Sequence, residues 1–501
     1  MEHQTTSLLS QTEDQRYEAI SPDNQNQDSK ESEQSLSIGE ITAILSTAFS
    51  YGCVNSTLFL ITLPIECERI ETQHPIPKSV SLGVFVAIAG ITQLVSPLVG
   101  MLSDTYKPPQ ELGQRMPYLV LGSIITTVGL FGQYWGSYEN FWVSYGISFF
   151  ADMVGFTMTY AMMITLIPDQ VPKQQTGIAN GILALLIVGG SLFGFGVYKF
   201  TRVERIQNMY GLYICIVITT TILTGLYAHD RDAALNRRRR NISVKNRRSH
   251  RRRHHVILGP WILLKTMIWD PLSSLDSTSL LEVYKIDVSK NYKFFIVTVS
   301  RLFYYCGISI QTFFLYFLHD IIHVRDDPEK EVANLAILLQ FSGAFICYPV
   351  GLASDQFFGG ARRPFIYLAC LIMGGVMVGM MFASSMHEMI ILCSILGAGN
   401  GMYLTMETSL AVDALPHTSI LDGENSSLSG GDAQLLGIWG VAAFLGSTLG
   451  PLIGGPLLYL VGSSSTADLD EGQDYSKLGY IVVLGLSASY FTFSAIALRW
   501  L

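Results

Sequence analysis

Long apolar stretches separated by short polar ones dominate the pattern of this sequence. A helix needs roughly 20 predominantly apolar residues to cross a hydrocarbon core of about 30 Å. Twelve stretches have that length, and the first six are 41–65, 79–103, 117–138, 141–167, 175–198 and 209–228. The other six are 294–318, 332–354, 364–385, 389–412, 433–460 and 478–499. The pattern predicts an all-α membrane protein with twelve transmembrane helices.

The composition supports this interpretation and narrows the chemistry. Only 14% of the 501 residues are charged and 49% are hydrophobic, whereas a soluble protein carries roughly 25% charged residues. The seven cysteines are scattered, and neither a CxxC pair nor a Cys/His spacing indicates a metal site or a disulfide framework. No phosphate-binding Gly-x-x-x-x-Gly-Lys-Ser/Thr loop occurs. We therefore expect no metal, no cofactor, no ATP-driven pump and no enzyme.

The charges divide the chain and predict its orientation. Residues 231–253 hold eleven of the 32 Lys and Arg residues, and such segments stay on the cytoplasmic side of membranes. An even number of spans then places both termini in the cytoplasm. The alternative, a nucleic-acid-binding patch, is disfavoured because a span ends only a few residues ahead, at about Ala228. Contact of this segment with anionic lipid is compatible with the loop interpretation.

The predicted organisation has four parts. Residues 1–40 form a disordered cytoplasmic N-tail, and 41–229 form the first six-helix bundle. Residues 230–293 form a basic cytoplasmic loop, and 294–501 form the second bundle. We expect a monomer, and the sequence leaves open whether it resides in the plasma membrane or an internal membrane such as the vacuolar one.

The two bundles repeat a set of polar motifs. Ser103-Asp104 is followed by Arg115, and Ser354-Asp355 is followed by Arg362-Arg363. The fourth span ends in Pro168-Asp169-Gln-Val-Pro, and the tenth ends in Asp413-Ala-Leu-Pro. Similar motifs in the same order at nearly one offset indicate two pseudo-repeated six-helix bundles.

On these motifs the chain resembles the major facilitator superfamily. More narrowly, it is similar to glycoside–pentoside–hexuronide cation symporters and related proton-coupled sucrose-type sugar transporters. The resemblance covers about residues 40–500, and it also rests on Glu407…Asp413 followed by Gly437-Ile-Trp. It implies two bundles that rock around a midplane site. It also implies a cytoplasmic gate, whose candidate residues are Asp104, Arg115, Asp355, Arg362, Arg363, Asp169 and Asp413. The alternative is that these charges only anchor the helix ends at the membrane surface.

Ionisable residues within the spans are few, namely Asp152, Arg301 and Glu407. Each costs roughly 2.5–3.5 kcal/mol at a helix centre, so each should face the bundle interior and pair. The pairs open to Arg301 are Glu407 and Asp152, and either pair could be purely structural. In the superfamily, spans one, four, seven and ten line the central cavity, and the three residues fall on these spans.

Helical spacing adds polar and aromatic residues to the same faces. Span ten carries Asn400, Tyr403 and Glu407, and span seven carries Arg301, Tyr304, Ile308 and Gln311. Span one carries Asn55, Phe59, Thr62 and Glu66, of which Glu66 is expected to reach the outer surface. The candidate coupling and substrate-cavity residues are Glu407, Asp152, Arg301, Asn55, Tyr304, Gln311, Asn400 and Tyr403. Hydroxyl-binding groups beside aromatic rings suit a sugar.

The predicted function is secondary active transport of a small polar solute. A sugar or glycoside moved by proton or other cation symport is the first hypothesis, with Glu407 as the proton-binding residue and Asp152 as the alternative. Two other hypotheses remain open. One is a nutrient sensor with a transporter fold, and the other is a carrier of a non-sugar solute such as an amino acid, a vitamin or a drug-like compound.

Overall fold

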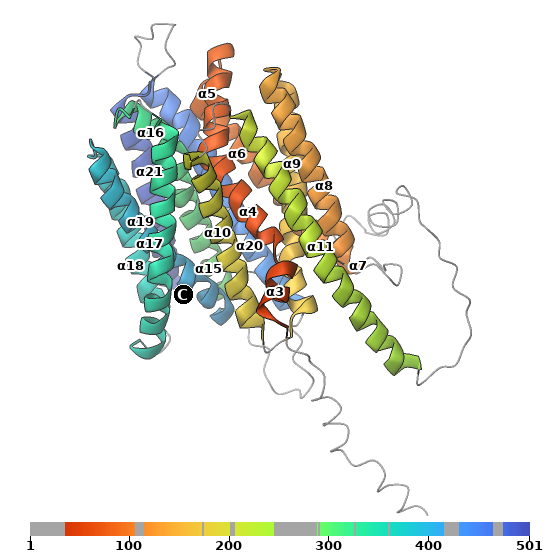
Figure 1. The fold of residues 1–501 in the computed structure, drawn as a ribbon. Coiled ribbons are helices and arrows are strands. Elements are labelled where there is room, and N and C mark those ends of the chain that lie inside the picture. The colour runs from red at the N-terminus through yellow and green to blue at the C-terminus, as the bar shows by residue number, and fades with distance from the viewer. Residues whose placement is uncertain are drawn as a thin grey trace, which may run out of the picture.

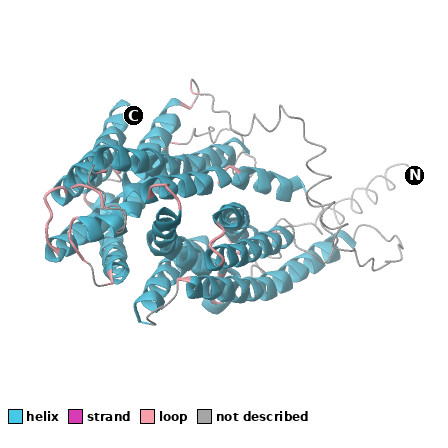
Figure 2. Ribbon diagram, turned by 90° about the horizontal axis from the view of Figure 1, so that it is seen from above, coloured by secondary structure: helices cyan, strands magenta, loops and turns pink. Residues whose placement is uncertain are grey.

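The computed structural model describes residues 36–105, 115–172, 175–200, 206–244, 288, 291–324, 327–358, 361–414, 430–463 and 474–501. These residues form a bundle of long helices that run between two ends of the molecule (Figure 1). Seen from above, the described elements are helices joined by loops (Figure 2). The β-type pairing in this part of the chain is an isolated bridge between Ser463 and Tyr475.

The first half of the chain contributes its helices in the expected order. They are α3 (Ile38–Ile44), α4 (Thr47–Thr57), the π-helical turn η1 (Leu58–Thr62), α5 (Leu63–Gln73), α6 (Lys78–Thr92), α7 (Val95–Thr105), α8 (Met116–Tyr138), α9 (Trp142–Gln170), α10 (Thr176–Phe200) and α11 (Gln207–Val244). Because lipid offers no partners for backbone N–H and C=O groups, apolar segments of this length satisfy them internally as helices.

The second half repeats this order. Its helices are α15 (Tyr292–Ile308), the 3-10 turn η4 (Ser309–Phe313), α16 (Phe314–Asp320), α17 (Pro328–Gln356), α18 (Arg363–Met380), α19 (Met386–Asp413), α20 (Gly430–Gly462), α21 (Lys477–Ala497) and the 3-10 turn η5 (Leu498–Trp500). Among the described residues, twelve helical segments are long and apolar enough to cross a membrane, six in each half. The predicted twelve-span, all-α fold is confirmed.

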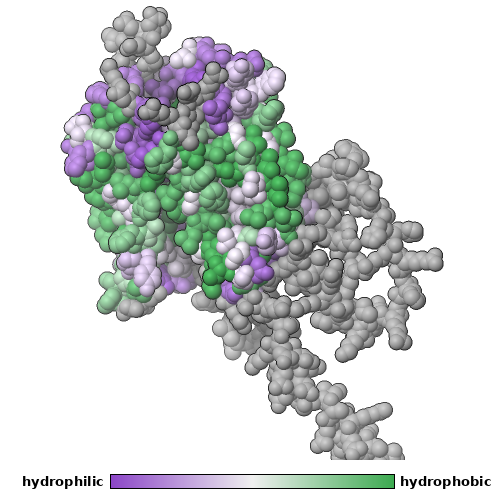
Figure 3. Space-filling view, viewed as in Figure 1, coloured by the Kyte–Doolittle hydropathy of each residue, from purple (hydrophilic) through white to green (hydrophobic). Residues whose placement is uncertain are grey.

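The molecule has two polar ends and an apolar middle. Helix α3 and the C-terminus lie toward one end, which we call the termini side, and the α5–α6 connection lies at the other end, which we call the opposite side (Figure 1). A broad hydrophobic band crosses the visible face, and hydrophilic residues gather at the opposite side (Figure 3). This band fits a bilayer core, with the helix axes crossing it.

Within each half, the first and fifth spans pack closely, α4 on α10 and α15 on α20. Glycine permits the approach: a Cβ on Gly190 would lie 2.0 Å from the Phe49 carbonyl oxygen, and one on Gly446 would lie 2.3 Å from that of Leu302. Small residues at helix contacts are typical of membrane bundles. The matching use of glycine supports the repeat inferred from the motifs.

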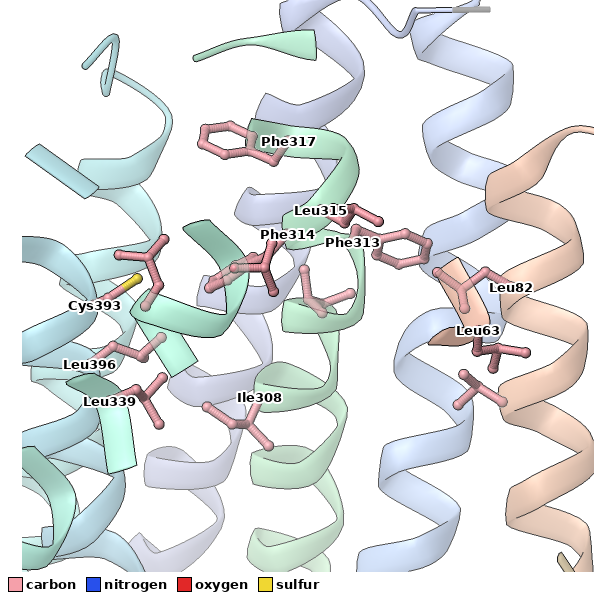
Figure 4. Close-up of a cluster of buried hydrophobic side chains, with 14 of the residues drawn as sticks. Leu63, Leu82, Ile308, Phe313, Phe314, Leu315, Phe317, Leu339, Cys393 and Leu396 are labelled. Atoms are coloured by element: carbon pink, nitrogen blue, oxygen red, sulfur yellow. The ribbon is translucent and has the colours of Figure 1, made fainter. Parts of the chain in front are cut away.

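The two halves meet through α6 against α20 and α10 against α17. Toward the opposite side, apolar side chains of the α16 region fill the space between the halves. Phe313 and Phe314 lie between Leu339 and Cys393 on one flank and Leu63 and Leu82 on the other (Figure 4).

Two predicted boundaries need correction. The predicted N-tail, 1–40, already contains the start of α3, where the Ser37 Oγ accepts a hydrogen bond from the Glu40 backbone N–H; residues 1–35 lie outside the described part. The apolar part of the sixth span ends at Ala228, as expected, but the helix α11 continues to Val244, so the predicted loop 230–293 begins within a helix. Its extra residues include Ala, Leu and a run of Arg, which are good helix formers, so the helix does not end where the apolar stretch ends. The rest of the predicted loop, apart from Val288 and residues 291–293, lies outside the described residues.

Candidate functional site

A buried ion pair joins the seventh and tenth spans. Arg301 of α15 places its Nη1 2.7 Å from Oε1 of Glu407 on α19, and the two residues are 9% and 4% exposed. Of the two pairings that the sequence left open, the structure contains Arg301–Glu407. Both residues sit toward the termini side of their helices, since α15 starts and α19 ends there.

Aromatic rings surround the guanidinium of this pair. The Arg301 Cζ lies 3.4 Å from the ring centroid of Trp439 on α20 and 4.9 Å from that of Tyr305. Besides the Arg301 Nη1, which makes the ion pair, three polar atoms here are buried without a hydrogen-bond partner: the Arg301 Nε, the Glu407 Oε2 and the Trp439 Nε1. Buried polar groups in native proteins nearly always have a hydrogen-bond partner, so this cluster can still bind a further polar group.

Asp152 occupies a different environment. It is fully buried on α9, and its Oδ2 accepts a hydrogen bond of 2.8 Å from Nε2 of Gln133 on α8. Its Oδ1 and the Gln133 Oε1 have no partner. Asp152 therefore belongs to the α8–α9 contact within the first half, and its recorded side-chain partner is Gln133.

Tyr304 and Tyr403 are packed rather than free to meet a solute. Their rings stack with centroids 3.5 Å apart and planes at 2°, and each residue is 1% exposed. The Tyr304 hydroxyl donates a hydrogen bond to the Asn400 Oδ1. This link fixes the amide of Asn400 at the edge of the cavity described next.

A cavity of about 240 Å³ lies between the two halves. It is nearer to the opposite side of the molecule than the ion pair is. Three expected residues line it: Asn55 of α4, Gln311 of η4 and Asn400 of α19. The structure adds Gln340 of α17 and the rings of Phe59 and Phe314. Sequence reasoning missed Gln340 because a lone glutamine in an apolar span gives no pairing signal. The predicted cavity residues thus fall into three groups: those that line this cavity, those of the ion pair, and those packed elsewhere, which are Asp152 against Gln133 and Tyr304 against Tyr403.

The face predicted for span one is only half right. Asn55 and Phe59 line the cavity, but the Thr62 hydroxyl is hydrogen-bonded to Tyr213 on α11. Glu66 was expected at the outer surface and is 0% exposed, held by Arg69 at 2.8 Å and by Ser137 at 2.6 Å. The π-helical turn η1 adds a residue to the helical turn, so positions after it rotate away from the cavity.

The gate motif of the first half forms a compact cluster on the termini side. The Arg115 Nε donates to the Asp169 Oδ2 at 2.8 Å, and its Nη1 donates to the Ser103 Oγ at 2.9 Å. One arginine therefore ties together the ends of spans two, three and four. Asp104 lies in α7, and its side chain is outside the described part of the structure.

The second half repeats this cluster with looser geometry. The Arg362 Nη1 donates to the Ser354 Oγ at 2.8 Å, and its Nε lies 4.0 Å from the Asp413 Oδ2. Arg363 is exposed, and the side chain of Asp355 is outside the described part. The repeated motif thus gives repeated contacts, and the described ones join helices of the same half.

A second polar cluster, on the opposite side, was not predicted. Lys78 begins α6 and is 3% exposed, with its Nζ 3.6 Å from the Glu68 Oε1 and 5.0 Å from the ring centroid of Tyr316. The Tyr316 hydroxyl donates to the Pro64 carbonyl oxygen at 3.0 Å. The contacts of Tyr316 with Lys78 and Pro64 cross from one half to the other, whereas Glu68 belongs to the same half as Lys78. Together with the contacts of Ser79 and Tyr475, we call this cluster the Lys78 closure.

Ser79 and Tyr475 complete this closure. The Ser79 Oγ donates to the Gly455 carbonyl oxygen at 3.0 Å and lies 2.9 Å from the Tyr475 hydroxyl. The Lys78 Nζ is also 5.7 Å from the Tyr475 ring centroid. These contacts join the two halves at the opposite side.

Comparison with known proteins agrees with this architecture. The family model of the Major Facilitator Superfamily matches residues 20–195. This match spans about a third of the chain, within its first half. The match favours the expectation of a transporter rather than an enzyme, and it does not reach the narrower sugar-symporter branch.

Solved structures extend the likeness to the whole chain. The crystal structure of the nucleoside transporter NupG covers 93% of this chain and 99% of its own, with a TM-score of 0.61 at 11% identity. A point mutant of NupG gives the same coverage and identity with a TM-score of 0.60. At this identity the likeness shows a shared fold. No curated protein sequence matches the chain significantly.

Proposed function

We propose that this major facilitator protein moves a small polar solute, with a sugar or glycoside as the first candidate, by proton symport with alternating access. The observation that carries the proposal is the Arg301–Glu407 pair with its unpaired neighbouring atoms. Removing an ion pair from water costs free energy, so a pair buried among aromatic rings favours a functional role. Its free Nε and Oε2 atoms offer sites where a solute or a proton can bind.

The physical basis of coupling is the balance at Glu407. Removal from water favours the neutral form of a carboxyl group, whereas the adjacent Arg301 favours the charged form. Arg301 and Glu407 stand on different helices, α15 and α19. A movement that alters their 2.7 Å separation changes this balance, so protonation and solute movement become linked.

The order of features along the bundle supports alternating access. From the opposite side toward the termini side, the Lys78 closure comes first, then the cavity with Gln311, and then the ion pair. A solute in the cavity has the closure on one side and the pair on the other. Rocking of the halves would open one and shut the other.

A nucleoside is the second candidate solute. Proteins of this fold include NupG, which is described as a nucleoside transporter. A nucleoside also combines a hydroxylated sugar with a planar base, and the cavity combines amide groups with the rings of Phe59 and Phe314. Uptake of labelled sucrose and uridine into vesicles with an imposed pH gradient would separate these candidates. A sensor would bind a solute without accumulating it.

The coupling residue is tested with Glu407→Gln. Because glutamine resembles the protonated carboxyl group, this variant should retain solute binding and exchange but lose uphill accumulation driven by a pH gradient. The measurement is uptake and counterflow in proteoliposomes. Asp152→Asn is the matched comparison, since Asp152 is a second carboxyl group that is fully buried within a span, and its side-chain partner is Gln133 rather than an arginine. Accumulation that survives in the Gln variant and is lost in the Asn variant would assign the proton to Asp152.

We also propose that the termini side faces the cytoplasm, because α11 ends there within the basic segment 231–253. A protease-sensitive tag inserted within residues 245–250 should be cut only after permeabilisation of the membrane. Cleavage in intact cells would reverse the orientation.

A further inference from the structure

The cavity between the halves contains amide groups that the protein leaves unpaired. The side chains of Asn55, Gln311 and Gln340 have no hydrogen-bond partner among the described residues, although all three line the cavity. Each residue is only partly buried, so the free amide groups face the cavity space. Polar groups within a membrane bundle need partners, and here a bound solute or water must supply them.

The cavity also lacks charge. Among the described lining residues there is no acidic or basic side chain. An ionised solute group placed here would lose its hydration and gain no counter-ion, which is strongly unfavourable. The chemistry of this cavity therefore selects against carboxylate and ammonium groups.

The remaining walls are apolar and aromatic. Phe59 and Leu60 come from the first half, whereas Phe314, Leu335 and Leu339 come from the second. A primary amide offers a donor and an acceptor side by side. Such a group pairs with a vicinal diol or with the N–H/C=O edge of a ring. The apolar walls suit the C–H face of a sugar or the flat face of a base.

The cavity is separated from the ion pair along the helices. Glu407 follows Asn400 by seven residues on α19, which is about 10 Å at the rise of an α-helix. Arg301 precedes Gln311 by ten residues. A small solute bound among the amides does not need to touch the pair.

We propose that this amide-lined cavity selects an uncharged solute rich in hydroxyl or amide groups, with Gln311 and Gln340 as residues that determine specificity. The Arg301–Glu407 pair is then a separate site, which couples proton binding to solute movement without contacting the solute. This inference rests on the proposed transport function and narrows its substrate class, because it excludes amino acids and other ionised solutes from the cavity.

The test is calorimetric binding to the purified protein in nanodiscs. The probes are sucrose (hydroxyl groups only), uracil (an amide edge only), uridine (both), glutamate and lysine. At least one uncharged probe should bind, and the charged probes should not. Gln311→Leu and Gln340→Leu should each raise its Kd about tenfold, because each removes a hydrogen-bonding group. Which of the three uncharged probes binds distinguishes a sugar from a base as the recognised group.

The control variant is Ser394→Ala on α19. Its hydroxyl donates to the Ile390 carbonyl oxygen of the same helix, and it lies outside the lining of this cavity, so the Kd should not change. Binding of glutamate or lysine that Gln311→Leu weakens would overturn the proposal, as would failure of every uncharged probe to bind. Binding without uptake would refute transport and leave the cavity assignment intact. Uptake with an unchanged half-saturation concentration in both leucine variants would refute the cavity assignment and leave the transport function intact.

Discussion

The two ends of this protein use polar contacts in different ways. On the opposite side, Tyr316 donates to the Pro64 carbonyl oxygen and Ser79 donates to that of Gly455, so both contacts join the two halves. On the termini side, Arg115 pairs with Asp169 and Arg362 approaches Asp413, so both contacts remain within one half.

In the proposed transport cycle, this difference separates two functions that rocking halves require. The clusters of Arg115 and Arg362 tie three helix ends together and keep each half rigid. The Lys78 closure ties the halves to each other and must break for the opposite side to open. Lys78 suits a contact that is made and broken, because a cation at a helix N-terminus is disfavoured by the helix dipole. The rings of Tyr316 and Tyr475 offset that cost only while the halves are together, whereas Glu68 lies in the same half as Lys78.

The largest effect is expected from filling the contact between α6 and α20. A Cβ on Gly455 would lie 2.3 Å from the backbone oxygen of Ser79, which cannot rotate away. Overpacking of this kind costs about 1–3 kcal/mol. Gly455→Ala should therefore disfavour closure and lower the transport rate by roughly tenfold or more, measured as uptake into proteoliposomes.

Gly440→Ala is the matched control on the same helix. A Cβ on Gly440 meets nothing within 4 Å among the described residues, so the rate should stay near that of the parent protein. Equal losses in the two variants would mean that α20 needs glycine for a reason unrelated to closure.

A smaller effect is expected from Lys78→Met, which keeps the length of the side chain and removes its charge. Cation–π contacts contribute about 0.5–2 kcal/mol, so the opposite side should open several times more often. The measurement is the rate at which a membrane-impermeant thiol reagent modifies Ser56→Cys, which lines the cavity, in a background without the seven native cysteines. Lys477→Met is the control, because Lys477 also begins a helix on that side but is exposed. An unchanged rate in Lys78→Met would show that the closure does not depend on the cation.

The sequence predicted the spans and the buried ion pair for physical reasons. Apolar length is a direct property of composition, so the twelve spans were visible. Ionisable residues within spans are so few that Arg301 had only two candidate partners, and one of them proved correct. The repeated motifs likewise indicated the arginine clusters, because Arg115 and Arg362 occupy matching positions.

The rest depended on features that leave little trace in the sequence. The π-helical turn at 58–62 and the 3-10 turn at 309–313 shift the register of cavity-facing positions, yet both segments are ordinary apolar sequence. Glu66 was misplaced because its partner Ser137 is 71 residues away. The Lys78 closure links Ser79 to Tyr475 across 396 positions, and no local pattern predicts such a pairing.

The smallest effect is expected on the termini side, from Asp169→Asn and Asp413→Asn. The two aspartate side chains are 42% and 59% exposed, and exposed ion pairs contribute about 0.2–1 kcal/mol. Asp169→Asn should be the more costly change, because Asp169 contacts Arg115 at 2.8 Å whereas Asp413 is 4.0 Å from Arg362. Both variants should transport within about threefold of the parent protein, since each loses a contact inside one half and none between the halves. Uptake and thermal stability measured on the same preparations would check this. A tenfold loss of transport without a loss of stability would mean that these aspartates also latch the two halves together when the termini side shuts. Asp355→Asn, at the end of α17, would then be expected to share that defect.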